Sequence, residues 1–242
     1  MLSTNFITGV KLFLDKAPKD SYYRNLKLFH GVSDIDLSSK ITIFTGENGS
    51  GKTTLLEAIA TKYGFNREGG TLNYNFVTRD SYKDMDKYIE LVKGISMKSF
   101  GYFFKAESFY NVQTALKEYD KGNTHGPTFG RDLDKFSHGE SFIEFFSKYV
   151  DKGLYILDEP ESALSPNNQI KLLCIIQEAL KQDAQFIIAT NSPILLSMPN
   201  TTIYNFSGDK ICKCTYEETD AYKITENFIN HKDVFLDELL NK

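Results

Sequence analysis

The sequence Gly-Glu-Asn-Gly-Ser-Gly-Lys-Thr at residues 46–53 follows directly on an apolar run at residues 41–45. This order of an expected strand, a glycine-rich turn and a helix opening at Lys52 constrains the fold more than any other feature. The first N–H groups of such a helix have no partner within it, and with the helix dipole they form an anion site. The order therefore predicts a phosphate-binding loop, the alternative being a glycine-rich turn before an ordinary helix.

The residue types within this loop suit a nucleoside triphosphate. Its glycines let the backbone approach phosphate oxygens without side chains in the way. We expect Lys52 to reach the β- and γ-phosphates and the Thr53 hydroxyl to complete a magnesium shell, so ATP and Mg²⁺ are the expected ligands. The residues expected to bind ATP are Gly46, Glu47, Asn48, Gly49, Ser50, Gly51, Lys52, Thr53 and Thr54.

Length and composition fit one cytoplasmic domain. The 242 residues are enough for a sizeable core, and a net charge of −4 gives no overall basic field for nucleic acid. No apolar run approaches membrane-spanning length, and the N-terminus lacks the layout of a signal peptide. The pair Cys212 and Cys214 has no second cysteine cluster to complete a zinc site. Reduced structural thiols are therefore favoured for these two residues and for Cys174. We expect no membrane contact.

Strand and helix patterns alternate along the chain. Strands are expected at residues 5–14, 41–45, 101–104, 154–157, 186–189, 201–206 and 210–215. Helices are expected at 52–63, 107–119, after Gly139, after a Ser165 cap with Pro166 at the first position, and at 225–240. The alternation predicts an α/β fold with a mostly parallel sheet flanked by helices, in a single domain spanning residues 1–242.

Two acidic residues end the buried strand expected at 154–157. A carboxylate at the C-terminal edge of a strand, beside the phosphate loop, is suited to hold magnesium, and we assign that role to Asp158. Glu159 is suited to polarise a water molecule for attack on the γ-phosphate. A solvated strand end is the alternative for this pair alone, but the loop upstream favours the catalytic interpretation.

Four segments stand in the order and rough spacing of the ATP-binding-cassette (ABC) ATPases, at residues 46–54, 136–140, 158–165 and 189–193. The chain most resembles small stand-alone bacterial ATPases described as AAA-type but built like cassettes. These are related to the chromosome-maintenance, double-strand-break repair and overcoming-lysogenisation ATPases. The resemblance implies a P-loop NTPase fold of ABC type with a small helical subdomain at about 105–150. No heptad pattern is sustained between Lys52 and Ser137, so no coiled-coil arm fits there.

The same resemblance implies a head-to-tail homodimer that forms on ATP binding and encloses two ATP molecules. Ser137 and Gly139 match the serine and second glycine of the signature motif, which contacts the γ-phosphate held by the other copy. His138 and Glu140 stand where that motif has glycine and glutamine. Taken alone, the sequence Ser-His-Gly-Glu favours a helix N-cap with an acid in the first turn over a signature motif.

Two further positions depart from the family pattern. Glu107 replaces a glutamine that meets magnesium and water; its carboxylate could bind the water shell of the cation, or it could be a solvated helix start. Asn191 replaces the switch histidine, and its amide can bond a phosphate oxygen but carries no positive charge. The resemblance and Asn191 together predict Mg-dependent ATP hydrolysis with slow turnover.

The biological function of the ATPase activity has several alternatives. It could act as a regulatory switch or scaffold that controls a partner effector with little hydrolysis, which Asn191 favours. A transporter nucleotide-binding subunit is a third function, and Glu107 argues against it. The sequence leaves nucleic-acid binding undecided. Tyr22 and Tyr23, with Arg24, are candidates to stack on adenine, although in a chain with 14% aromatic residues a chance placement is the favoured alternative.

Overall fold

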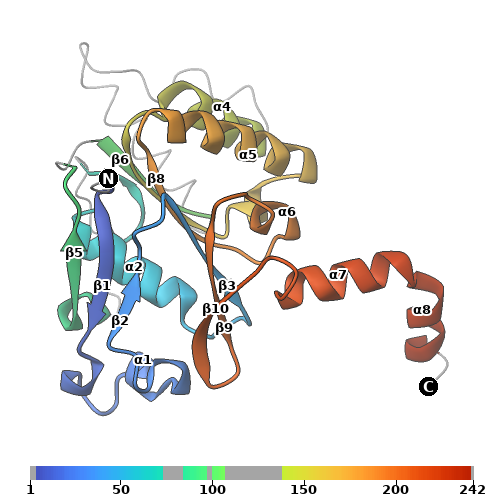
Figure 1. The fold of residues 1–242 in the computed structure, drawn as a ribbon, viewed down its shortest axis with the longest axis horizontal. Helices are drawn as coiled ribbons and strands as arrows, with labels where there is room; N and C mark the ends of the chain where they lie inside the picture. The colour runs from blue at the N-terminus through green and yellow to red at the C-terminus, as the bar shows by residue number, and fades with distance from the viewer. Residues whose placement is uncertain (1–3, 73–83, 97–99, 107–137, 241–242) are drawn as a thin grey trace.

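Two sheets form the framework of the fold in the computed structural model, which describes residues 4–72, 84–96, 100–106 and 138–240 (Figure 1). The larger sheet has seven strands, in the spatial order β10 (Lys210–Cys214), β9 (Thr202–Ser207), β3 (Ile41–Gly46), β8 (Gln185–Ala189), β7 (Gly153–Asp158), β6 (Phe100–Lys105) and β4 (Gly70–Thr71). The smaller sheet is antiparallel, in the order β2 (Asp34–Asp36), β1 (Ile7–Leu12) and β5 (Ile89–Lys93).

The centre of the larger sheet is parallel. Strands β9, β3, β8, β7 and β6 all run in one direction, and only β10 and β4 at its edges pair antiparallel. Every residue of β7 and β8 is buried, as expected for strands covered on both faces. The predicted α/β fold with a mostly parallel sheet is confirmed.

Helices cover both faces of this sheet. Helix α2 (Lys52–Tyr63) lies between the two sheets and buries Leu55, Leu56 and Ile59 completely. On the opposite face lie α4 (His138–Tyr149), α5 (Pro166–Lys181) and α6 (Pro193–Leu196), seen at the top of Figure 1. The predicted cap of α5 is confirmed, because Ser165 Oγ accepts a hydrogen bond from the N–H of Asn168 at 3.4 Å.

The C-terminal helices extend away from the rest of the molecule (Figure 1). They are α7 (Asp220–Asn230) and α8 (Lys232–Leu240), and none of their residues is buried. The prediction of a helix start at 225 was wrong, because Thr219 Oγ1 accepts a hydrogen bond from the N–H of Tyr222 and starts α7 at Asp220.

Shorter elements connect the main ones. They are α1 (Tyr22–Asn25) and the 3₁₀ turns η1 (Leu14–Lys16), η2 (Lys27–Phe29), η3 (Met85–Tyr88) and η5 (Pro160–Ala163). The helix predicted at 107–119 lies outside the described residues, as does most of the predicted helical subdomain. Within the described segments, no helix is both long enough and apolar enough to cross a bilayer. Cys174, Cys212 and Cys214 form no disulfide among the described residues.

Candidate functional site

The loop at residues 46–53 leaves the centre of the sheet, between the ends of β8 and β9, in a conformation that demands glycine. Gly46, Gly49 and Gly51 have φ angles of +133°, +80° and +100°. A Cβ atom on Gly46 would lie 2.4 Å from the carbonyl oxygen of Phe206, and one on Gly51 would lie 2.8 Å from Leu26. Both positions therefore exclude a side chain on steric grounds as well as by backbone conformation.

The loop presents unused hydrogen-bond donors. No described residue accepts a hydrogen bond from the backbone N–H groups of Gly49, Lys52 or Thr53. Helix α2 begins here, so its positive dipole end adds to these donors. Together they form a cradle for an anionic group, as the sequence predicts for a phosphate.

Lys52 folds back over this cradle. Its ammonium group donates to the carbonyl oxygens of Gly46 at 2.7 Å and Glu47 at 2.8 Å. Only 4% of the residue is exposed. Burial lowers the pKa of Lys52, and the nearby carboxylates of Glu159 and Asp158 oppose that shift. The cation is thus buried next to the cradle, where it is held by backbone carbonyl oxygens.

Asp158 lies beside the start of α2. Its Oδ1 accepts a hydrogen bond from the Thr53 hydroxyl at 3.1 Å, so the two predicted magnesium ligands are in contact. Burial raises the pKa of Asp158 to about 7, and the Thr53 hydrogen bond opposes that rise. Both side chains offer the hard oxygen atoms that magnesium prefers.

Glu159 is held in a strained turn. Its backbone is left-handed, with φ 48° and ψ 51°, which is uncommon for a residue other than glycine. Its N–H donates to Ala189 O at 2.9 Å, and its carbonyl accepts from the N–H of Ser162 at 3.0 Å. Glu159 lines a cavity of about 270 Å³ that is also lined by Tyr22, Asn48, Gly49, Gly51, Lys52, Thr53 and Thr54.

An ion pair that the sequence did not predict lies next to this site. Lys105 Nζ is 2.7 Å from Glu57 Oε1, with only 10% and 6% of the two side chains exposed. Lys105 ends β6 and faces Asp158 in the parallel register, so its charge lies near the predicted magnesium ligand. The sequence offered one signal for this ion pair, a lysine at the end of an apolar strand. Only the strand order shows which residues are its neighbours.

Asn191 lies against the start of the loop. Its Oδ1 accepts hydrogen bonds from the Gly46 N–H at 3.0 Å and from the Thr45 hydroxyl at 3.1 Å. Its own backbone N–H donates to Glu161 Oε1 at 2.8 Å. The amide oxygen is therefore used in hydrogen bonds within the protein. Nδ2 is the atom of this side chain that can bond a phosphate oxygen.

The predicted signature motif is described only in part. Ser137 and Glu107 lie outside the described residues. The described part of helix α4 starts at His138 and contains Gly139 and Glu140. The prediction that Gly139 lies at a helix start depends on the residues before it, which lie outside the described part of the chain.

The two tyrosines proposed to meet adenine have different surroundings. Tyr22 is 51% exposed, lines the loop cavity and donates its hydroxyl to Gly49 O at 2.9 Å. Tyr23 is buried and donates to Asp84 at 2.6 Å, so of the two candidates it is the one that does not line the loop cavity. Adjacent residues of a short helix point in different directions, and only Tyr22 faces the loop.

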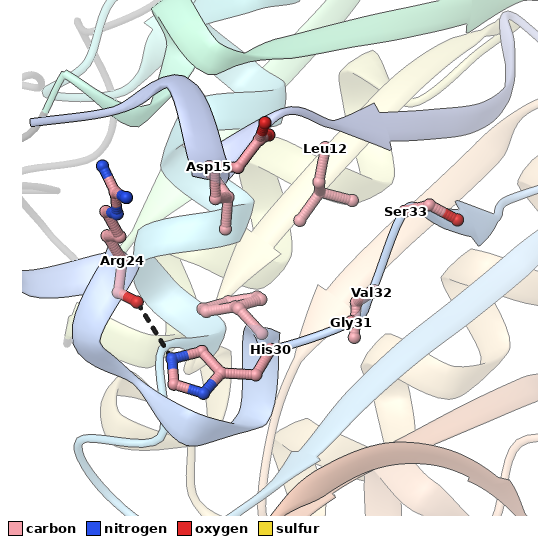
Figure 2. Close-up of a pocket in the computed structure, with 9 residues that line it drawn as sticks. Leu12, Asp15, Arg24, His30, Gly31, Val32 and Ser33 are labelled. Carbon is pink, nitrogen blue, oxygen red and sulfur yellow. Dashed lines mark hydrogen bonds between the residues drawn. The ribbon is translucent and has the colours of Figure 1, made fainter.

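Arg24 lies on the wall of a different cavity, of about 450 Å³ (Figure 2). Its guanidinium donates to the carbonyl oxygen of Ala17, and its own carbonyl oxygen lies 3.2 Å from Nε2 of His30. Arg24 does not line the loop cavity, so the structure does not support its proposed help in adenine binding.

Comparison with known proteins gives one family and several similar structures. The AAA domain family matches residues 22–187. Curated protein sequences give no match. The SMC head domain from Thermotoga maritima is similar at 15% identity and TM-score 0.46, over 87% of this chain and 99% of that one. The protein cbiO1 from Clostridium perfringens, part of the ABC transporter complex cbiONQ, is similar at 11% identity and TM-score 0.48, over 95% and 98%.

A third similar structure is an SmcHead bound to the C-winged helix domain of ScpA. Its identity is 13% and its TM-score 0.44, over 88% of this chain and 99% of that chain. At these sequence identities, the likenesses concern the backbone fold alone. The fold assignment itself rests on the strand order, the parallel centre of the sheet and the helices on its two faces.

Proposed function

We propose that this chain, which belongs to the AAA domain family, binds ATP at its phosphate loop and hydrolyses it in a site completed by a second copy. One observation carries the proposal. A single edge of the sheet brings together a glycine-shaped cradle of free N–H groups, the buried cation of Lys52 and the carboxylates of Asp158 and Glu159. These are the groups that phosphoryl transfer requires.

The residues present fit a magnesium ion. Thr53 Oγ1 and the Asp158 carboxylate are adjacent oxygen ligands, and magnesium takes few protein ligands, filling its shell with water and phosphate oxygens. No group of three or more histidine, cysteine, aspartate or glutamate side chains within the described part of the chain forms a metal cluster. When bound, Mg²⁺ neutralises charge on the β- and γ-phosphates.

The chain's own groups supply the rest of the reaction. The Lys52 ammonium exchanges its bonds to Gly46 O and Glu47 O for bonds to phosphate oxygens. The free N–H groups of the loop bind the remaining phosphate oxygens. The Glu159 carboxylate orients a water molecule and accepts its proton as the water attacks the γ-phosphate.

The second copy contributes the signature motif to the nucleotide. The order of the motifs along the chain supports the signature role of Gly139 and a head-to-tail dimer closed by ATP. The Asn191 side chain is uncharged, so the γ-phosphate loses the cationic partner that a histidine could provide. We therefore expect slow turnover and a long-lived closed dimer.

Glu159→Gln tests the chemistry and the assembly together. The variant keeps a side chain of the same shape but cannot accept the proton, so kcat falls about 100-fold while ATP affinity is retained. Sizing with ATP and Mg²⁺ shows a dimer. Glu178→Gln, an exposed position on α5, serves as the control. Unchanged turnover in Glu159→Gln would remove Glu159 as the base, and a persistent monomer would remove the sandwich dimer.

A regulatory switch that acts on a partner protein is the second candidate function. Helices α7 and α8 hold six of the ten large apolar side chains exposed among the described residues, which is why they are the first place to look for a partner contact. They also carry five acidic and two basic residues. This surface suits a protein with an apolar groove and a basic rim. ATP binding and dimerisation without measurable wild-type turnover would favour the switch over the hydrolase.

A further inference from the structure

We propose that Glu161 and Asn191 form a positioning relay, which ties the first amide of the phosphate loop to the turn that carries Glu159. The inference rests on the proposed function, because it concerns the same site. Neither residue makes or breaks a bond in the reaction. Their role is to fix the distance between the loop that holds the nucleotide and the carboxylate that activates water.

The relay consists of two consecutive hydrogen bonds. The Gly46 N–H donates to Asn191 Oδ1 at 3.0 Å, and the Asn191 N–H donates to Glu161 Oε1 at 2.8 Å. Glu161 belongs to η5, and Glu159 is the residue that caps this turn. Gly46 and Glu161 are 115 positions apart in sequence, so the loop and the turn are joined here by tertiary contacts rather than by the chain.

The turn needs such support. Glu159 has a left-handed backbone, and its neighbours must hold it there. The Glu159 N–H bond to Ala189 O anchors one side of the turn to β8. The Glu161–Asn191 bond anchors the other side to the residue that contacts the loop. With both anchors present, a shift of the loop on nucleotide binding moves Asn191 and hence the turn.

A purely structural role does not explain why a carboxylate occupies position 161. Its Oε2 atom is buried and has no hydrogen-bond partner among the described residues, which is unfavourable for a carboxylate. Its charge also acts on the buried Lys52, together with those of Asp158 and Glu159. Both observations place this carboxylate within the electrostatic environment of the nucleotide site.

Hydrogen exchange in the nucleotide-free protein gives a test that does not depend on ATP. Glu161→Ala removes the acceptor for Asn191, so exchange of the segment at residues 41–54 accelerates about tenfold, because the bond from Gly46 to Asn191 loses its support. Glu161→Gln keeps an acceptor oxygen in the same place and leaves exchange close to wild type. Ser162→Ala, an exposed position in the same turn, is the matched control.

Asn191→Ala separates the relay from a general loosening of the structure. It removes Oδ1 but keeps the backbone N–H that bonds Glu161, so exchange of residues 41–54 accelerates while the turn at 159–163 is unaffected. Because the relay passes through Asn191, adding Glu161→Ala to this variant produces no further acceleration of the loop. In turnover, Glu161→Ala lowers kcat about tenfold and leaves KM within about twofold.

Unchanged loop exchange in Glu161→Ala would overturn the relay, as would equal acceleration in Glu161→Gln and Glu161→Ala. An additive double variant would overturn it as well. A wild-type protein that fails to bind or hydrolyse ATP overturns the proposed function instead. The exchange measurements still decide whether the relay exists in that case.

Discussion

The phosphate-loop edge and the C-terminal helices distribute their polar and apolar groups in opposite ways. At the loop, charged residues are buried, with Lys52 only 4% and Asp158 only 6% exposed. On α7 and α8, apolar residues are exposed, with Ile229 at 70% and Leu240 at 76%. Burying a charge and exposing an aliphatic side chain are both unfavourable without a compensating partner.

The difference separates a site whose groups are already held in place from a surface whose apolar side chains are exposed to solvent. At the loop, hydrogen bonds donated by Lys52 and Thr53 and one accepted by Asn191 hold the groups in place before any ligand binds. The C-terminal helices pack mainly on one another and on α6. Substitutions should therefore affect ligand binding or stability strongly at the loop and weakly at the C-terminus.

Lys52→Ala should show the largest effect. It removes the cation that compensates the γ-phosphate charge, so the Kd for ATP rises at least about 100-fold, since hydrogen bonds to charged groups contribute about 1.5–3 kcal/mol each. Isothermal titration with ATP and Mg²⁺ measures the change. Lys62→Ala, an exposed lysine on the same helix, is the control. Retained affinity in Lys52→Ala would contradict the assignment of the loop.

Gly46→Ala tests whether the loop is shaped by its backbone. The added Cβ would meet Phe206 O at 2.4 Å with φ at +133°, so the free energy of unfolding should fall by about 2 kcal/mol or more. Gly208→Ala is the comparison, because Gly208 also has a positive φ but a Cβ added there would meet no atom within 4 Å. Denaturant unfolding should show the smaller loss at Gly208; equal losses would contradict a steric role for Gly46.

Asp158 makes stability depend on pH in the nucleotide-free protein. Its pKa is about 7 in the folded state against 3.8 for an ordinary aspartate, so the folded state binds the proton more tightly. The resulting stabilisation is complete below the lower value and is lost as pH rises through 7. Between pH 6 and 8, without magnesium, wild type should lose about 1 kcal/mol relative to Asp158→Asn. A parallel pH dependence of the two proteins in denaturant unfolding would contradict this.

Phe228→Ser should produce the smallest effect on the fold. Phe228 is 41% exposed on α7, so the free energy of unfolding should change by only about 0.5 kcal/mol. Phe206→Ala is the buried comparison and should cost about 3–5 kcal/mol. Thermal unfolding measures both changes. A large loss in Phe228→Ser would show that α7 packs against the body more closely than its exposure indicates.

The sequence predicted the parts of the site that are local along the chain. The strand, glycine turn and helix around Lys52 form one continuous segment, and an acid at a strand end identifies Asp158. The α5 cap at Ser165 is local in the same sense. Periodicity and turn chemistry act over a few residues, which is why these features can be read without a structure.

Contacts between distant segments could not be predicted in this way. Lys105 and Glu57 pair across the site, and Asn191 Oδ1 bonds the Gly46 N–H, because the strand order places β6 beside β7 and β8 beside β3. Spacing along the chain contains no information about that order. The sequence could not distinguish between Tyr22 and Tyr23 for a related reason, since the distinction depends on how a single-turn helix is oriented.

Strand β3 has its two sheet neighbours, β8 and β9, in the last third of the chain. During synthesis, the phosphate loop leaves the ribosome long before either neighbour exists. Until residues 202–206 have emerged, the backbone of β3 lacks one of its two hydrogen-bonded flanks, and Gly46 lacks the residue 206 that it packs against. Nucleotide binding should thus begin only once residues 202–206 have emerged, well after the loop itself has been synthesised.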